Sequence, residues 1–170
     1  MTPLSTYIAW EGDSIVATTS PIGYPIVSAT LSPIKQGRTF AVSGSTMADL
    51  NSRASSVDAT YVAGAKNILF VGDGRNDMST GSAATFVADL KAYCLARKAV
   101  GWKVVVATVL PSTLSGFNTK RNTANASIVA DTSFYDALAR FDLDSTMGPD
   151  AAASNTTYYS DGTHPTAAGH

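Results

Sequence analysis

Three side chains in this 170-residue sequence have the types and spacing of a nucleophile, a base and a carboxylate that orients the base. Ser14 stands in a Gly-Asp-Ser turn after an apolar run, and His164 follows Asp161 by three residues in the segment SDGTHP. A serine hydroxyl becomes a nucleophile when an imidazole within hydrogen-bond reach takes its proton and a carboxylate orients that imidazole. The other histidine, His170, is the last residue printed and has no such carboxylate near it in sequence. The trio predicts acyl transfer through a serine.

Three apolar runs each end in a turn of small and polar residues. The turns are Gly12-Asp13-Ser14, Ser43-Gly44-Ser45 and residues 72–77, which read GDGRND. In an open parallel sheet the carboxyl ends of the strands share one edge, where ligands bind, so we expect the three turns to converge. A serine that lies at this edge and begins a helix is in the positive field of the helix N-terminus.

Apolar runs and helical patterns alternate along the chain, which is typical of parallel strands joined by crossover helices. We expect strands at 6–12, 38–43, 67–72, 103–110 and about 137–143. Helical spacing of apolar residues predicts one helix over 83–100 and another after Thr46, its N-cap. The sequence shows no internal repeat and no linker, and its length favours one domain.

Composition excludes several classes of function. With 45% hydrophobic residues, 15% charged residues and a net charge of −1, the chain can bury a core and has no basic footprint for nucleic acid. No apolar run approaches the roughly 20 residues of a membrane span, so we expect a soluble domain. The N-terminal residues lack the pattern of a signal peptide. Ser, Thr and Ala are abundant, as in many exported and virion proteins, so a secreted or virion-associated domain stays open.

Several other residues have competing interpretations. Residues 73–77 could suggest a calcium loop, but Arg75 stands at the third position and the downstream Glu is missing, so we expect no metal. Cys94 is the only cysteine in the sequence, so an internal disulfide is excluded. Because it lies on an apolar helix face, we expect it in the core. Arg75 could contact a substrate or be a surface charge. Asp77 is expected to brace the turn that aims Asn76.

Four short motifs in this order resemble the SGNH, or GDSL-type, esterase and lipase family. They are Gly12-Asp13-Ser14, Gly44, Gly74-Arg75-Asn76-Asp77 and Asp161-Gly162-Thr163-His164-Pro165. A Gly-Asp-Ser turn alone is explained more simply as a strand-to-helix turn capped by its aspartate. The four motifs together span nearly the whole chain. Taken together, they favour a catalytic serine over a simple capped turn.

The resemblance implies a three-layer α/β/α sandwich with a central, mostly parallel five-stranded sheet of flavodoxin type. It implies Ser14 as nucleophile, His164 as general base and Asp161 as its orienting carboxylate, without a cofactor. It also implies an oxyanion hole made by the backbone N–H groups of Ser14 and Gly44 and the side-chain amide of Asn76. A glycine at position 44 would let the backbone approach closely.

The end of the sequence departs from the family pattern. The family continues into a C-terminal helix after His-Pro, whereas only residues 166–170 follow here. We therefore expect a single domain over residues 1–170 with that helix shortened or missing. The oligomeric state cannot be derived from these patterns.

Three functions stay open at this level. The first is hydrolysis of a carboxylic ester through an acyl-enzyme on Ser14. The second is O-acyl transfer by the same residues, and the third is a non-catalytic carbohydrate-binding module on the same fold. Residues 18–32 and 113–123, expected as loops, are too polar and mixed to argue for a broad lipid groove. A small acyl group, such as acetate on a carbohydrate, suits them better.

Overall fold

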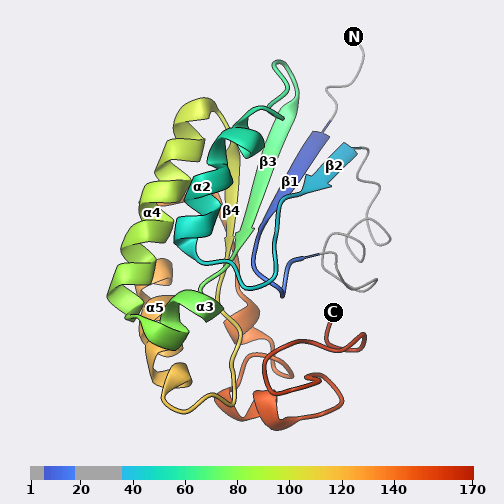
Figure 1. Ribbon diagram of the computed structural model, residues 1–170, viewed down its shortest axis with the longest axis vertical. Helices are drawn as coiled ribbons and strands as arrows, with labels where there is room; N and C mark the ends of the chain where they lie inside the picture. Colours follow the sequence, from blue (N-terminus) through green and yellow to red (C-terminus); the bar gives the residue numbers. More distant parts are fainter. Residues whose placement is uncertain (1–5, 18–35) are drawn as a thin grey trace.

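The computed structural model describes residues 6–17 and 36–170 as five parallel strands with helices packed against them (Figure 1). The strand order is β2-β1-β3-β4-β5, and each neighbouring pair is parallel. The strands are β1 Thr6–Gly12, β2 Gln36–Thr39, β3 Lys66–Gly72, β4 Lys103–Ala107 and β5 Ala137–Ala139. The expected α/β fold of flavodoxin type, with a parallel five-stranded sheet, is confirmed.

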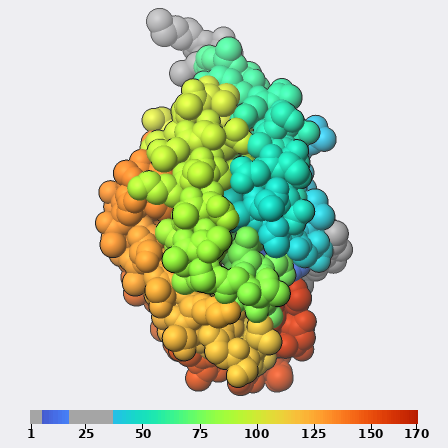
Figure 2. Space-filling view, turned by 60° about the vertical axis from the view of Figure 1, so that its left-hand side comes forward, coloured from blue at the N-terminus to red at the C-terminus, as the bar shows by residue number. Residues whose placement is uncertain are grey.

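One helical layer covers a face of this sheet. The helices are α2 Met47–Asp58, α3 Arg75–Thr80, α4 Ala83–Val100 and α5 Phe117–Ala130. Helix α4 lies between α2 and α5, as Figure 2 shows from the helical side. Short 3-10 turns follow at η1 Thr132–Phe134, η2 Phe141–Leu143 and η3 Asp150–Ser154. No helix in the described part is long and apolar enough to cross a membrane.

The core lies between the sheet and the helical layer. Alternate residues of the central strands point into it, including Leu69 and Val71 of β3, and α4 contributes Phe86 and Leu90. Cys94 is fully buried there, as expected, and burial raises the pKa of its thiol to about 12. A thiol held in its neutral form is a poor nucleophile, so Cys94 is a packing residue.

Several expected boundaries are wrong. β2 covers 36–39 instead of 38–43, although the Phe40 and Val42 N–H groups still donate to the carbonyls of Trp10 and Gly12 at 2.7 and 3.1 Å. β4 ends at Ala107, and β5 gives way to η2 after Ala139. The largest error is the expected loop at 113–123, whose second half forms the start of α5.

Candidate active site

The carboxyl ends of β1 and β3 bring the first and third turns together. Gly12 and Gly72 lie opposite each other in the parallel register, so Asp13 and Asp73 leave neighbouring strands at the same level. Gly12 has a φ of 153°, and a Cβ there would overlap the carbonyl of Gly72. Only glycine allows this approach. The second turn joins them, because Val42 N–H donates to the Gly12 carbonyl.

Ser14 lies in the turn that follows β1. The carboxylate of Asp13 accepts the N–H of Ile15 at 2.9 Å, and the Asp13 carbonyl accepts the N–H groups of Val16 and Ala17 at 3.2 and 2.9 Å. These bonds form one helical turn with the half-buried Ser14 inside it. The start of the expected helix is seen only as this turn, because residues 18–35 lie outside the described residues, as does the expected polar loop at 18–32.

His164 contacts Ser14 and Asp161 through its two ring nitrogens. The Oγ of Ser14 is 2.8 Å from Nε2, although the residues lie 150 positions apart in sequence. Nδ1 is 2.7 Å from Oδ2 of Asp161. An ionised carboxylate only accepts hydrogen bonds, so Nδ1 carries the proton and Nε2 is left to accept the serine hydroxyl. The structure therefore brings together the predicted nucleophile, base and carboxylate in the order that serine activation requires.

Asp161 is held in its charged form. Partial burial favours the neutral acid, but the backbone N–H and ring of His164, with the N–H of Thr163, outweigh it and lower the pKa of Asp161. The two N–H groups donate to Oδ1 at 2.8 and 3.0 Å and leave Oδ2 for the ring. A carboxylate fixed in this way can orient the imidazole.

The loop that carries Asp161 and His164 is attached to the segment after β4. Hydroxyl oxygens of Ser112 and Thr163 are 2.9 Å apart, and Thr113 N–H donates to the Gly162 carbonyl at 2.9 Å. Gly162 has a φ of 76°, and a Cβ there would overlap the side chain of Thr113. The glycine between the carboxylate and the histidine therefore lets this loop pack closely.

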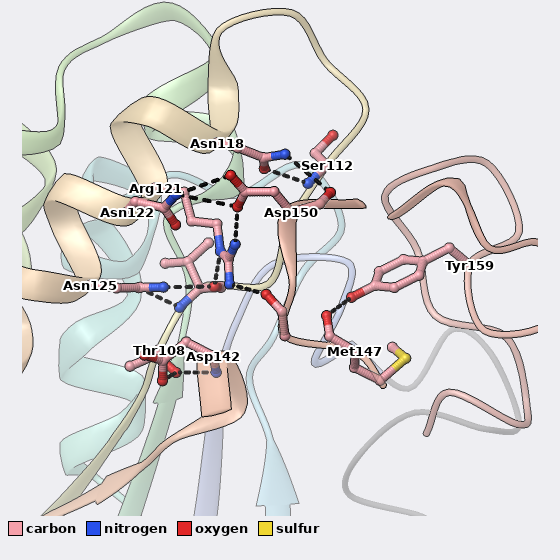
Figure 3. Close-up of polar contacts among 12 residues, drawn as sticks. Thr108, Ser112, Asn118, Arg121, Asn122, Asn125, Asp142, Met147, Asp150 and Tyr159 are labelled. Carbon is pink, nitrogen blue, oxygen red and sulfur yellow. Dashed lines mark hydrogen bonds and ion pairs between the residues drawn. The ribbon is translucent and has the colours of Figure 1, made fainter. Parts of the chain in front are cut away.

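A buried arginine fastens the C-terminal segment to the end of the sheet (Figure 3). Arg121 of α5, 2% exposed, donates from Nε to Val109 O at 2.8 Å and from Nη2 to Gly148 O at 2.6 Å. Its Nη1 forms an ion pair with Asp150 at 2.7 Å. Further along, the Tyr159 hydroxyl donates to Met147 O at 2.8 Å. Residues 148 and 150 are thus fixed to α5, and Tyr159, closer to His164, is fixed to the neighbouring Met147.

Asn76 and Gly44, expected to form the oxyanion hole, lie on adjoining turns. The Asn76 amide donates one N–H to the carbonyl of Ser45 at 2.8 Å, which leaves its second N–H for another acceptor. Gly44 has a φ of 82°, and nothing lies within 4 Å of the place where its Cβ would be. The backbone conformation, not a close approach to another part of the protein, explains this glycine. Asp77 accepts Met47 N–H at 3.1 and 3.2 Å and so ties α3 to the start of α2.

An ion pair that the sequence analysis missed joins the first and second turns. Arg53 donates from Nε to Glu11 at 2.7 Å, from Nη1 to the Ser45 hydroxyl at 2.9 Å and from Nη2 to Gly12 O at 3.2 Å. Burial raises the pKa of Glu11 to about 7, although Arg53 and Tyr93 act in the opposite direction. Neither residue belongs to a motif, and only the folded chain brings them together.

Arg75 is half-buried, so it is not a freely solvated surface charge. Its guanidinium lies 4.8 Å above the ring centre of Phe117, a cation–π contact. The side chain lines a cavity together with Asp13, Asp73 and Thr108. Among the described residues, no group of three or more potential metal ligands is found.

No protein-family model and no curated protein sequence matches the chain. Solved structures do match it, all at low sequence identity. A lipolytic G-D-S-L family protein from Veillonella parvula superposes with a TM-score of 0.77 at 14% identity, covering 96% of this chain and 91% of that one. A putative lipolytic G-D-S-L family protein from Desulfitobacterium hafniense gives 0.75 at 19% identity, with coverages of 96% and 92%.

An enzyme with a stated substrate is also among the similar structures. An acetylxylan esterase from Geobacillus stearothermophilus superposes with a TM-score of 0.69 at 17% identity, covering 96% of this chain and 88% of the esterase. At such identities the likeness concerns the backbone arrangement and not the chemistry. The chain therefore has the α/β fold of the GDSL-type lipolytic proteins over nearly its whole length.

Proposed function

We propose that the protein is a serine esterase of the SGNH, or GDSL, type that hydrolyses a carboxylic ester. The observation that carries this proposal is the chain of contacts from Ser14 Oγ through the ring of His164 to Asp161, at 2.8 and 2.7 Å. A surface that only binds has no need of a hydroxyl, an imidazole and an ionised carboxylate in this order. The likeness to esterase and lipolytic structures supports the same reaction class.

In the proposed reaction, His164 Nε2 takes the Ser14 proton as Oγ attacks the ester carbonyl carbon. The tetrahedral intermediate collapses when its carbon–oxygen bond to the alcohol breaks and the imidazolium gives the proton to the departing alcohol. A water molecule then attacks the acyl-enzyme by the same proton path and releases the acid. Asp161 stays ionised throughout and stabilises the imidazolium.

The negative charge of the intermediate requires donors that are in place before the reaction. We propose the N–H groups of Ser14 and Gly44 and the second amide N–H of Asn76 for this role. The bond from Asn76 to Ser45 O fixes the plane of the amide, which supports a preorganised donor. Arg75 is proposed as a substrate contact beside them.

For the substrate we propose an ester of a small acyl group, with acetyl on a carbohydrate as the leading example. The expectation from polar flanking segments is supported by one similar structure, that of an acetylxylan esterase. A sugar hydroxyl as leaving group also needs the proton that His164 can return.

A panel of 4-nitrophenyl esters with two-, four- and eight-carbon acyl groups tests the reaction class and the acyl preference. We expect kcat/KM to fall as the acyl chain lengthens, and Ser14→Ala to abolish turnover while its circular dichroism spectrum stays unchanged. Failure of the folded protein to hydrolyse any of these esters would contradict the proposal. Acetate release from acetylated xylooligosaccharides tests the carbohydrate part of the proposal separately. If the protein hydrolyses nitrophenyl esters but releases no acetate from these sugars, only the carbohydrate substrate is excluded.

A further inference from the structure

Two carboxyl groups are buried side by side beneath the turn that carries Ser14. Asp13 is 1% exposed and Asp73 is 6% exposed, and both line the same cavity. The positions follow from the sheet, because each residue comes directly after one of the paired glycines Gly12 and Gly72. Two ionised carboxylates in such a place would repel each other strongly, because burial weakens the screening by solvent.

The hydrogen bonds of this pair leave three buried oxygens without a donor. Oδ1 of Asp13 accepts the N–H of Ile15, but Oδ2 of Asp13 and both carboxyl oxygens of Asp73 have no partner among the described residues. A buried acceptor without a donor is costly. One proton shared between the two carboxyls would satisfy Oδ2 of Asp13 and one oxygen of Asp73 at once.

We propose that Asp73 carries a proton at neutral pH and donates it to Oδ2 of Asp13, and is thereby a positioning residue for the Ser14 turn. Its effect is transmitted by Asp13, whose other oxygen and carbonyl hold the N–H groups of residues 15–17. The contribution of Asp73 to catalysis rests on the proposed esterase function. The proton bound between Asp73 and Asp13 does not depend on that function.

The surrounding charges favour the proton on Asp73. Asp13 faces Arg75 and His164, which favour its ionised form, and it accepts a backbone N–H. Asp73 faces Asp13 and Asp77, both of which disfavour its ionised form, and only the backbone N–H of Gly74 acts in the opposite direction. Burial raises the pKa of Asp13 to about 6, and burial together with the neighbouring Asp13 raises the pKa of Asp73 well above its usual range.

Unfolding by urea over a series of pH values tests the proton without reference to catalysis. A group whose pKa is raised by folding stabilises the protein at low pH, and this contribution is lost as pH rises through the folded-state pKa. Relative to Asp73→Asn, the wild type should lose stability as pH rises above the range in which an ordinary aspartate titrates and through the raised pKa of Asp73, with a slope approaching one proton. Parallel pH curves for the two proteins would overturn the proposal.

Two substitutions at the same position test the positioning. Asparagine can donate to Asp13 as a protonated aspartic acid does, so Asp73→Asn should keep kcat/KM within about threefold at pH 7, whereas Asp73→Ala should lose about tenfold or more. Asp73→Asn should also keep its activity at alkaline pH, where the wild type loses the shared proton. Equal activity losses in the two variants would contradict a donor role.

Asp58→Asn supplies the matched control. Asp58 is also a partly buried carboxylate, but it ends α2 at the opposite edge of the sheet, where it accepts the Trp102 indole N–H and pairs with Arg97. The control should leave the pH slopes of stability and activity as in the wild type. If no ester is hydrolysed at all, the unfolding measurement still decides whether Asp73 holds the proton.

Discussion

The side-chain amide of Asn76 donates to the backbone carbonyl of Ser45 at 2.8 Å, so the turn after β3 holds the turn after β2 directly. This contact does two things at once. It fixes the amide plane of Asn76, and it places that amide beside Gly44, the other proposed oxyanion donor outside the Ser14 turn. Two of the three turns that carry the proposed oxyanion donors are therefore joined directly, although their strands β2 and β3 are not neighbours in the sheet.

Replacement of Asn76 by alanine tests its part in this junction. Asn76→Ala should lower kcat on a short-chain ester by about 10² to 10³ with little change in KM, because the second N–H acts mainly on the transition state. Steady-state kinetics at substrate concentrations on both sides of KM separate the two constants. An unchanged kcat would exclude Asn76 from the mechanism.

Arg53 is expected to act on catalysis through position alone. Its guanidinium contacts Glu11, Gly12 O and the Ser45 hydroxyl, and a lysine cannot reach three such acceptors at once. Arg53→Lys should therefore lower kcat about tenfold while KM stays close to that of the wild type.

Arg97→Lys is the control for that experiment, since Arg97 is likewise an ion-paired arginine with little exposure, but its partner is Asp58 at the far edge of the sheet. It should reduce the melting temperature without changing kcat. If Arg53→Lys behaves in the same way, Arg53 is a structural residue only.

Arg121 is expected to matter mainly for the stability of the C-terminal segment. Arg121→Ala leaves the carbonyls of Val109 and Gly148 without their donor, so the free energy of unfolding should fall by roughly 2–4 kcal/mol. Urea denaturation measures the loss. Limited proteolysis should show new cuts after residue 140, and a cleavage pattern like that of the wild type would contradict the clamp.

The pH dependence of activity follows from the protonation states at the site. Ser14 can transfer its proton only to a neutral imidazole, so kcat/KM should rise with pH as the imidazolium form of the base disappears. Asp161 does not contribute to this rise, because its pKa is lowered and it is already ionised. A profile without such a rise, with chemistry limiting the rate, would exclude His164 as the base.

Asp161→Asn provides the companion measurement. The amide cannot hold the imidazole in the required tautomer as the carboxylate does, so kcat should fall by about 10⁴ while the fold is retained. A loss smaller than tenfold would show that the carboxylate contributes little to orienting the base.

Sequence patterns predicted β1 and α4 to the residue because most of their buried positions are apolar, although Glu11 of β1 and Arg97 of α4 are also buried. Helix α5 was missed because two of its five buried positions are Arg121 and Asn125. These polar residues are buried since they find partners at the end of β4, including Val109. A periodicity counted only on apolar residues cannot detect such a helix.

The same distinction holds at the site. Ser14, Asp161 and His164 could be predicted because each belongs to a short motif whose neighbours reveal its chemistry. Arg53, Glu11 and Asp73 could not, because their significance lies in partners from other parts of the chain. Contacts of this kind depend on the register of the folded sheet, as the pairing of Gly12 with Gly72 illustrates. The catalytic roles themselves stay predictions that the experiments above address.

Covalent labelling of Ser14 tests the central claim most directly. A fluorophosphonate forms a stable bond only with a serine whose hydroxyl is activated, as the 2.8 Å contact with His164 Nε2 would provide. Peptide mass spectrometry of the labelled protein should locate one adduct, on Ser14, and His164→Ala should prevent its formation under the same conditions. Labelling of a different serine, or no labelling of the folded wild type, would contradict the assignment of Ser14 as the nucleophile.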